Sequence, residues 1–231
     1  MNGSDAVASR ILVVDDQELV RAGFRLILEH AGLDVVGEAA DGLEAVEQAL
    51  AHAPDVVLMD IRMPRLDGIE ATRRIVAARP ETRILVLTTF DLDDHVYAAV
   101  QAGATGFLLK DVSPSDLVHA VAVAARGDAM LAPGPTSRLL SRFASGPAPG
   151  EAAARLEGVT EREHEVLRLV ARGRSNQEIG AELFLSEATV KTYVSRLLTK
   201  LDLRDRVQLA VLAYEHGIVR AGENRTTPPS Q

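Results

Sequence analysis

The first half of the chain alternates short apolar runs with stretches in which apolar residues recur at helical spacing. Four of its five apolar runs are nearly continuous in Val, Ile, Leu, Phe and Met, which is typical of parallel strands covered by helices on both faces. The runs are Ile11–Val14, Val35–Glu38, Val56–Met59, Ile84–Leu87 and Gly106–Leu109. The helical stretches are Leu19–Glu29, Leu43–Ala51, Gly68–Ala78, Asp93–Ala102 and Pro114–Arg126. This alternation predicts an α/β domain over residues 9–130, built on a doubly wound five-stranded parallel sheet.

A stretch of different composition follows this first region. Residues 131–155 are rich in Pro, Gly, Ser and Ala, which is typical of a linker, and Thr136–Phe143 within them is long enough for a short helix. At the end of the chain, we predict that residues 221–231 form a disordered tail.

The segment between linker and tail has helical periodicity with short breaks. Thr160 with Glu163 has the spacing of a capping box, which marks the start of a helix. Within Ile179–Leu201 the pattern indicates two helices joined by a tight turn, the geometry of a helix-turn-helix. We therefore predict an all-α domain of four helices over residues 156–220.

Composition narrows the classes of function. The 231 residues suffice for two domains, and the absence of cysteine excludes disulfides and thiolate metal sites. No apolar run approaches the roughly 18 residues of a membrane span, and no signal peptide is visible, so we expect a cytoplasmic protein without a membrane partner.

Residues 1–130 carry 11 Lys and Arg against 21 Asp and Glu, and residues 131–231 carry 14 against 12. The contrast suggests two domains with different partners, although solubility alone also shapes surface charge.

Five polar residues stand where the predicted strands end, namely Asp15, Asp16, Asp60, Thr88 and Lys110. Because the carboxyl ends of parallel strands meet at one edge of a sheet, we expect these side chains in one pocket. Three carboxylates in one cleft need a cation or a proton, and oxygen ligands suit Mg²⁺. Asp60 can then act as a nucleophile toward a phosphoryl donor, with Lys110 and Thr88 on the phosphoryl oxygens. Each residue alone is ordinary strand-end chemistry, and only their combination indicates a site.

The segments around these residues resemble the receiver domain of two-component response regulators. The resemblance covers roughly Ile11–Gly127 and lies in Val13–Asp16, Leu58–Gly68, Val86–Thr89 and Gly103–Lys110. It implies a flavodoxin-like fold and a partner histidine kinase that phosphorylates Asp60. One position departs from the common pattern, because Asp111 follows Lys110 where many receivers have proline.

The same resemblance implies a role for each pocket residue. Asp60 would be the phosphoacceptor, and the Mg²⁺ ligands would be Asp15, Asp16, Asp60 and the backbone carbonyl of Arg62. The residues that bind the phosphoryl group or respond to it would be Thr88, Thr89, Lys110 and Phe107.

The helical region resembles the LuxR-type helix-turn-helix, in Val159–Val170, Gly173–Ile179 and Ser186–Val194. With a receiver in front, the whole chain is similar to the NarL/FixJ family of response regulators. Apolar residues of Glu187–Leu201 share one face, and polar residues on the rest can reach phosphates and base edges. We predict DNA contacts from Thr189, Lys191, Thr192, Tyr193, Ser195, Arg196, Lys200, Arg204 and Arg206. An ordinary solvated face would be the simpler reading if this helix stood alone.

A single small domain with this modest positive charge should bind DNA weakly. We therefore expect an active homodimer on double-stranded DNA with two half-sites. The last helix offers Val207, Val211, Leu212 and Tyr214, which form either a pairing surface or the core of the domain.

The favoured hypothesis is a transcription regulator that is controlled by phosphorylation of Asp60 and is not an enzyme in the usual sense. A second hypothesis is a DNA-binding regulator whose receiver works without phosphorylation. A third is a phosphatase that uses Asp60 covalently. The third is disfavoured because Arg62 stands two residues after Asp60, where an acid would be needed to activate water.

Overall fold

The computed structural model describes residues 9–88, 93–126, 156 and 158–219. The chain divides into two compact units, Met1–Met130 and Leu131–Gln231. Four predicted features lie outside the described residues: Thr89, the 131–155 linker, its short helix at Thr136–Phe143, and the tail at 221–231.

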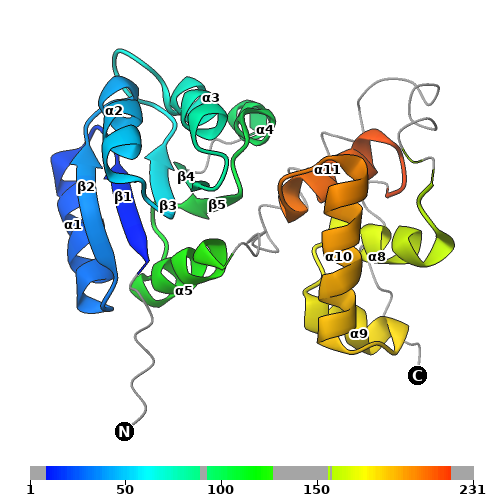
Figure 1. Cartoon of the computed structure of the whole chain (residues 1–231). Helices are drawn as coiled ribbons and strands as arrows, with labels where there is room; N and C mark the ends of the chain where they lie inside the picture. Colours follow the sequence, from blue (N-terminus) through cyan, green and yellow to red (C-terminus); the bar gives the residue numbers. More distant parts are fainter. Residues whose placement is uncertain (1–8, 89–92, 127–155, 157, 220–231) are drawn as a thin grey trace, which may run out of the picture. The chain divides into compact units, whose positions relative to one another are not determined.

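The first unit contains a five-stranded parallel sheet with the strand order β2-β1-β3-β4-β5 (Figure 1). The strands are β1 (Arg10–Val14), β2 (Asp34–Ala39), β3 (Val56–Asp60), β4 (Arg83–Thr88) and β5 (Gly106–Leu109). All five agree with the predicted runs to within a residue at each end. The prediction of a doubly wound parallel sheet is confirmed.

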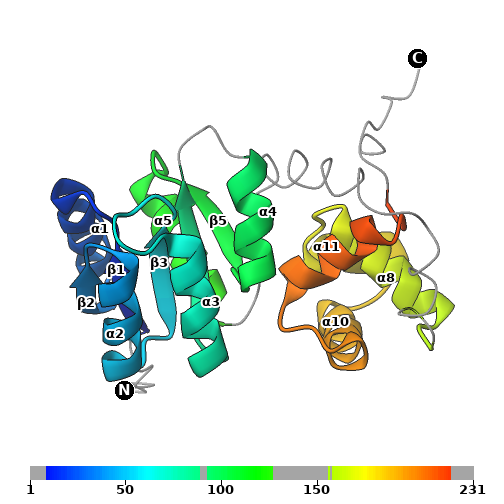
Figure 2. The same cartoon turned by 90° about the horizontal axis from the view of Figure 1, so that it is seen from above.

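Helices cover both faces of this sheet, with α1 and α5 on one side and α2 and α3 on the other (Figure 2). The helices of this unit are α1 (Glu18–His30), α2 (Gly42–His52), α3 (Gly68–Ala78), α4 (Asp93–Ala102) and α5 (Pro114–Ala125). Contacts join α1 with α5, α2 with α3, and α3 with α4. Three of these helices begin at side-chain caps, Asp41, Asp67 and Ser113.

The core explains why the strands carry so few polar residues. Residues 11–14 of β1 and 56–59 of β3 are completely buried. One large apolar cluster joins these central strands to α1 through Phe24 and Leu28, and to α5 through Leu117. The central strands are therefore rigidly held, which fixes the positions of the polar residues that follow them.

The described part of the second unit consists of four helices, as predicted. They are α8 (Glu161–Ala171), α9 (Asn176–Leu183), α10 (Glu187–Leu201) and α11 (Arg206–Glu215). The capping box of Thr160 and Glu163 is present, and a second one joins Ser175 and Glu178 at the start of α9. A short turn links α9 to α10, so the predicted helix-turn-helix is confirmed. Across the described part of the chain, no helix is both long enough and apolar enough to cross a membrane.

Candidate functional site

The residues predicted to form the pocket gather at the carboxyl end of the sheet, where β1 and β3 stand side by side. Strand order reverses there, because the chain leaves β1 toward β2 and returns to β3 on the other side. Open α/β sheets bind ligands at such a point. Asp15 directly follows β1, and Asp60 is the last residue of β3. The topology thus brings together two carboxylates that are 45 residues apart.

Lys110 joins these two carboxylates. Its Nζ lies 2.7 Å from Asp15 Oδ2 and 3.0 Å from Asp60 Oδ2. The lysine directly follows β5, and its backbone N–H donates to the carbonyl of Thr88 at 2.8 Å. That hydrogen bond ties the end of β5 to the end of β4, so the cation is aimed from a fixed backbone.

The pKa values of Asp60 and Lys110 depend on burial and on the neighbouring charges. Burial raises the pKa of Asp60 above its usual range, and nearby Asp15 adds to the rise, while Lys110 and the Ile61 N–H act against it. Burial acts to lower the pKa of Lys110, but the hydrogen bonds and charges of Asp15 and Asp60 outweigh it and raise that pKa. The lysine is therefore charged at neutral pH, whereas burial disfavours the charged form of Asp60.

Asp16 completes a cluster that suits a divalent cation. One carboxylate oxygen from each of Asp15, Asp16 and Asp60 lies within 4.8 Å of the other two. Asp15 and Asp60 are buried, whereas Asp16 is exposed, which leaves room for water on the open side. Asp15 and Asp60 each keep one oxygen on a backbone N–H, from Gln17 at 3.0 Å and Ile61 at 2.8 Å. Three convergent oxygen ligands and an exposed side match the preferences of Mg²⁺.

The remaining predicted pocket residues are placed as follows. Arg62 is exposed in the loop after β3, and its carbonyl lies two residues from Asp60 in that loop. Thr88 ends β4 and is 8 % exposed. Phe107 in β5 is 6 % exposed, so its ring already lies in the interior in this structure. The peptide bond between Lys110 and Asp111 is trans.

Two groups that the sequence analysis did not single out hold the loops of the pocket. Arg21 of α1 donates from Nη1 to the Asp15 carbonyl at 2.7 Å, and its Nε lies 3.5 Å from Glu38 of β2. In the loop after β3, Arg65 pairs with the buried Asp41 at the start of α2. Sequence carried no signal for either pair, because their members belong to elements whose contact depends on the tertiary fold.

Gly68 closes the loop after β3. A Cβ atom at this position would lie 1.9 Å from the carbonyl oxygen of Asp60. The Gly68 N–H also donates to the Ile61 carbonyl at 2.9 Å. Only glycine lets α3 begin this close to the strand that carries Asp60.

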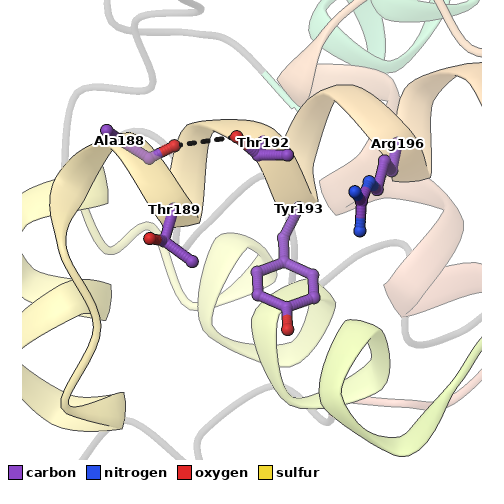
Figure 3. Close-up of a pocket in the computed structure, with 5 residues that line it drawn as sticks. All are labelled: Ala188, Thr189, Thr192, Tyr193 and Arg196. Atoms are coloured by element: carbon purple, nitrogen blue, oxygen red, sulfur yellow. Dashed lines mark hydrogen bonds between the residues drawn. The ribbon is translucent and has the colours of Figure 1, made fainter.

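The predicted DNA-binding residues fall into two groups. The first lies on the outward side of α10, where Thr189, Thr192, Tyr193 and Arg196 line one shallow pocket together with Ala188 (Figure 3). Lys191 and Ser195 are exposed on the same helix. The opposite side, with Val190, Val194 and Leu197, is buried. The periodicity argument thus placed the two faces of this helix correctly.

The second group has partners inside the domain. Lys200 Nζ lies 2.6 Å from Glu163 Oε2 and donates to the Gly158 carbonyl at 2.8 Å. Arg206 donates to Asn176 Oδ1 at 2.7 Å and to the Arg174 carbonyl. These contacts tie α10 and α11 to the starts of α8 and α9.

Three further features of the second unit concern Arg204, the pKa of Glu163 and the apolar residues of α11. The Arg204 side chain is half-buried, and its backbone N–H donates to Gln208 Oε1 at 2.8 Å. The ion pair with Lys200 is the first cause of the lowered pKa of Glu163, and its capping hydrogen bonds with Thr160 add to the effect. In α11, the four apolar residues that offered either core or pairing surface are all buried: Val207, Val211, Leu212 and Tyr214.

The comparisons with known proteins agree with this architecture. A family model of response regulator receiver domains matches residues 11–122, and the model of the luxR family of bacterial regulatory proteins matches residues 157–213. Two relatives from Bacillus subtilis (strain 168) are each 42% identical over 91% of this chain. They are the transcriptional regulatory protein LiaR and the uncharacterized transcriptional regulatory protein YxjL, matched over 99% and 97% of their lengths.

A solved structure extends the likeness across both units. The crystal structure of the response regulator ChrA, from a heme-sensing two-component system, is 37% identical with a TM-score of 0.50. The match covers 92% of this chain and 99% of that one. The chain belongs to the two-component response regulators that join a receiver domain to a LuxR-type DNA-binding domain. Proteins of this architecture regulate transcription, and the relatives above are named as transcriptional regulators.

Proposed function

We propose that this response regulator is switched by phosphorylation of Asp60, with a histidine kinase as donor and Mg²⁺ in the acidic pocket. The observation that carries the proposal is the convergence of Asp15, Asp16, Asp60 and Lys110 at one edge of the sheet. Structural ion pairs also bury carboxylates, but a third, exposed carboxylate beside such a pair leaves an open coordination side. That arrangement favours a ligand site over a purely structural pair.

The pocket residues divide the work of phosphoryl transfer. An Asp60 carboxylate oxygen attacks the phosphorus, the bond from phosphorus to the donor's imidazole nitrogen breaks, and the imidazole leaves with its electron pair. Lys110, already 3.0 Å from Asp60 Oδ2, would move onto a phosphoryl oxygen. Thr88 would donate its hydroxyl to another such oxygen. Mg²⁺, held by Asp15, Asp16, Asp60 and the Arg62 carbonyl, would neutralise the charge that collects there.

Gel electrophoresis in a phosphate-binding matrix tests the acceptor. The protein is incubated with acetyl phosphate and Mg²⁺, and we expect a retarded band that disappears in Asp60→Asn and when the metal is chelated. Asp34→Asn is the matched control, because Asp34 is an exposed carboxylate at the start of β2. A retarded band that persists in Asp60→Asn would refute the assignment.

We further propose that the outward side of α10 reads DNA. Its contact residues would be Thr189, Lys191, Thr192, Tyr193, Ser195 and Arg196. Four of the six are exposed and Thr189 and Tyr193 are half-buried, opposite a buried face of the same helix, and the helix-turn-helix presents them outward. Lys200, Arg204 and Arg206 stay predicted contacts, although the side chain of Lys200 holds α10 against α8 and that of Arg206 holds α11 against the start of α9.

Binding to a duplex selected by the phosphorylated protein from a randomised pool tests this surface. Arg196→Ala should weaken binding by about 10- to 100-fold, the range expected for one specific contact of about 1–3 kcal/mol. Arg168→Ala is the matched control, because Arg168 is exposed on α8. Equal losses in the two variants, or none in Arg196→Ala, would count against α10 as the reading surface. Size measurements on the same samples test the predicted homodimer.

A further inference from the structure

Helix α10 carries two shallow pockets of different chemistry on its outward side. The first is lined by Ala188, Thr189, Thr192, Tyr193 and Arg196 (Figure 3). The second is lined by Glu163, Ser195, Arg196, Thr199 and Lys200. All the residues of the second pocket carry a hydroxyl or a charge, whereas Arg196 is the one charged residue that lines the first. The two pockets therefore suit different chemical groups.

The threonine hydroxyls of the first pocket are already bonded within the helix. Thr192 Oγ1 donates to the Ala188 carbonyl at 3.0 Å, and the Thr192 methyl group lies on the side away from Ala188 (Figure 3). Thr189 Oγ1 lies 2.8 Å from the hydroxyl of Ser186, the N-cap of α10. A hydroxyl has one hydrogen to donate, so Thr192 has none left for a base. Methyl groups and the Tyr193 ring are therefore the main groups that face this pocket.

The hydroxyl bond of Thr192 is by itself ordinary. A threonine inside a helix commonly bonds to the carbonyl four residues earlier, and Thr199 does so with the Ser195 carbonyl at 3.1 Å. The surroundings distinguish the two threonines. Ala188 and Thr189 place two further methyl groups in the pocket of Thr192, whereas Thr199 shares its pocket with charged side chains. The combination of a bonded hydroxyl and an apolar pocket on the outward side indicates a ligand with an apolar group.

Thymine offers the base edge that fits such a pocket. In the major groove all four bases present hydrogen-bonding groups, and thymine also presents its C5-methyl group. We propose that α10 recognises thymine through this pocket, with the thymine methyl group against the Thr192 methyl group. This inference rests on the proposed function, in which the outward side of α10 reads DNA, and it names the base that the pocket selects. Thr192 determines specificity by its methyl group and not by its hydroxyl.

Replacement of thymine by deoxyuridine tests the contact, because it removes the methyl group and keeps the base pairing. The full-length protein, treated with acetyl phosphate and Mg²⁺, selects a duplex from a randomised pool, and we expect one thymine to be present in every selected half-site. Deoxyuridine at that position of one half-site should weaken binding about fourfold in fluorescence anisotropy, the loss expected for one buried methyl group. A selection without a recurring thymine, or equal affinity for the two duplexes, would overturn the proposal.

Three variants assign the effect to one side chain. Thr192→Ser keeps the hydroxyl and removes the methyl group, so the preference for thymine over uracil should fall below about twofold. Thr192→Val keeps the methyl group and removes the hydroxyl, so the preference should stay near its wild-type value. Thr199→Ser is the matched control, because it makes the same change at an exposed threonine of α10 outside this pocket. If Thr192→Val lost the preference and Thr192→Ser kept it, the hydroxyl would read the base and the proposal would fail.

A methyl group on a different base provides an independent test. In this duplex a cytosine–guanine pair replaces the thymine–adenine pair, and the cytosine either carries or lacks a C5-methyl group. The methylated duplex should bind the wild-type protein more tightly than the unmethylated one, whereas Thr192→Ser should bind both alike. Equal affinity of the wild type for the two duplexes would overturn the proposal, because the preference for thymine would then come from another part of the base pair.

Arg196→Ala, measured on the same duplexes, separates this inference from the proposed function. If neither Arg196→Ala nor deoxyuridine changes the affinity, α10 is not the reading surface and the proposed function itself fails. If Arg196→Ala weakens binding and deoxyuridine does not, only the thymine contact fails.

Discussion

The receiver pocket and helix α10 assemble their polar residues in opposite ways. The pocket draws Asp15, Asp60 and Lys110 from three strand ends across almost a hundred residues, and its two aspartates are buried. The outward face of α10 takes its residues from two consecutive helical turns, and most are exposed. In the pocket, each side chain is positioned by the fold of a whole domain. On α10, the helix itself and its packing against the domain are enough to position the outward side chains.

Because of this difference, a substitution in the pocket and a substitution on α10 should affect different numbers of properties. A substitution in the pocket alters both the stability of the receiver and its chemistry, because the same contacts serve both. On α10, contacts that hold the helix and contacts that face outward are separate residues. The predictions below use that separation, and they run from the largest expected effect to the smallest.

The largest effect is expected at Gly68. In Gly68→Ala the new Cβ would lie 1.9 Å from the Asp60 carbonyl oxygen and 3.1 Å from the Ile61 Cα, both backbone atoms that cannot move alone. We expect the receiver to lose about 3 kcal/mol of unfolding free energy, the upper range for overpacking, and to label poorly at Asp60. Urea unfolding followed by circular dichroism measures the first, and acetyl phosphate labelling the second.

The matched change in the second unit is Gly180→Ala, whose Cβ would lie 2.7 Å from the Leu185 carbonyl oxygen. This contact is less severe, so we expect a smaller loss, confined to the unfolding of the DNA-binding domain. If Gly68→Ala unfolded like the wild type, α3 would not be held against Asp60 as described.

Lys110→Met should have the next largest effect. It leaves Asp15 and Asp60 without their cation, and because the Lys110 side chain is 15 % exposed we expect a cost of no more than about 3 kcal/mol, the lower end for breaking a buried ion pair. Mg²⁺ can replace the lost charge, so the ion should raise the melting temperature of the variant more than that of the wild type. Lys191→Met, at an exposed lysine, is the control and should unfold like the wild type. Equal stabilisation of both by Mg²⁺ would argue against a metal site beside Lys110.

The contrast between Lys110 and the lysines of α10 shows what sequence can predict. Strand-end positions identified the members of the pocket, because parallel strands force their ends together. Helical periodicity likewise separated Val190 and Val194 from the outward residues. The strand and helix assignments succeeded for the same reason, since burial leaves a regular pattern in the chain.

The contacts of long lysine and arginine side chains could not be predicted in this way. Lys200 and Arg206 were predicted to contact DNA, yet their flexible side chains reach carboxylate, amide and carbonyl oxygens in or just before other helices. Arg21 shows the same limit in the receiver, where it binds the Asp15 carbonyl. The reach of these side chains depends on which helices are neighbours, and periodicity within one helix carries no information about that.

Lys200→Met and Lys191→Met test this distinction directly. Lys200→Met leaves the buried Glu163 carboxylate without its cation, so we expect the DNA-binding domain to lose about 1–3 kcal/mol of unfolding free energy. Lys191→Met should leave stability unchanged but reduce the salt dependence of DNA binding by about one unit of log–log slope. Thermal unfolding and fluorescence anisotropy at several salt concentrations separate the two. Identical behaviour of the two variants would show that Lys200 also acts mainly outward.

The smallest effect is the pH dependence of the stability that the Lys200–Glu163 ion pair gives to the DNA-binding domain. Lys200 and the Thr160 cap lower the pKa of Glu163 in the folded domain. A carboxyl with a lowered folded pKa stabilises the domain above its unfolded value, about 4.3, and this contribution is lost as the pH falls through the folded value. The DNA-binding domain should therefore lose stability below about pH 4.3, while Glu163→Gln should be less stable at pH 7 and show a weaker decline. Urea titrations between pH 7 and pH 3 measure both curves. If the stability of the wild type and of Glu163→Gln changed with pH in parallel, the pKa of Glu163 would be the same in the folded and unfolded domain. The contact between Lys200 and Glu163 would then stabilise the domain only through packing of the Lys200 side chain.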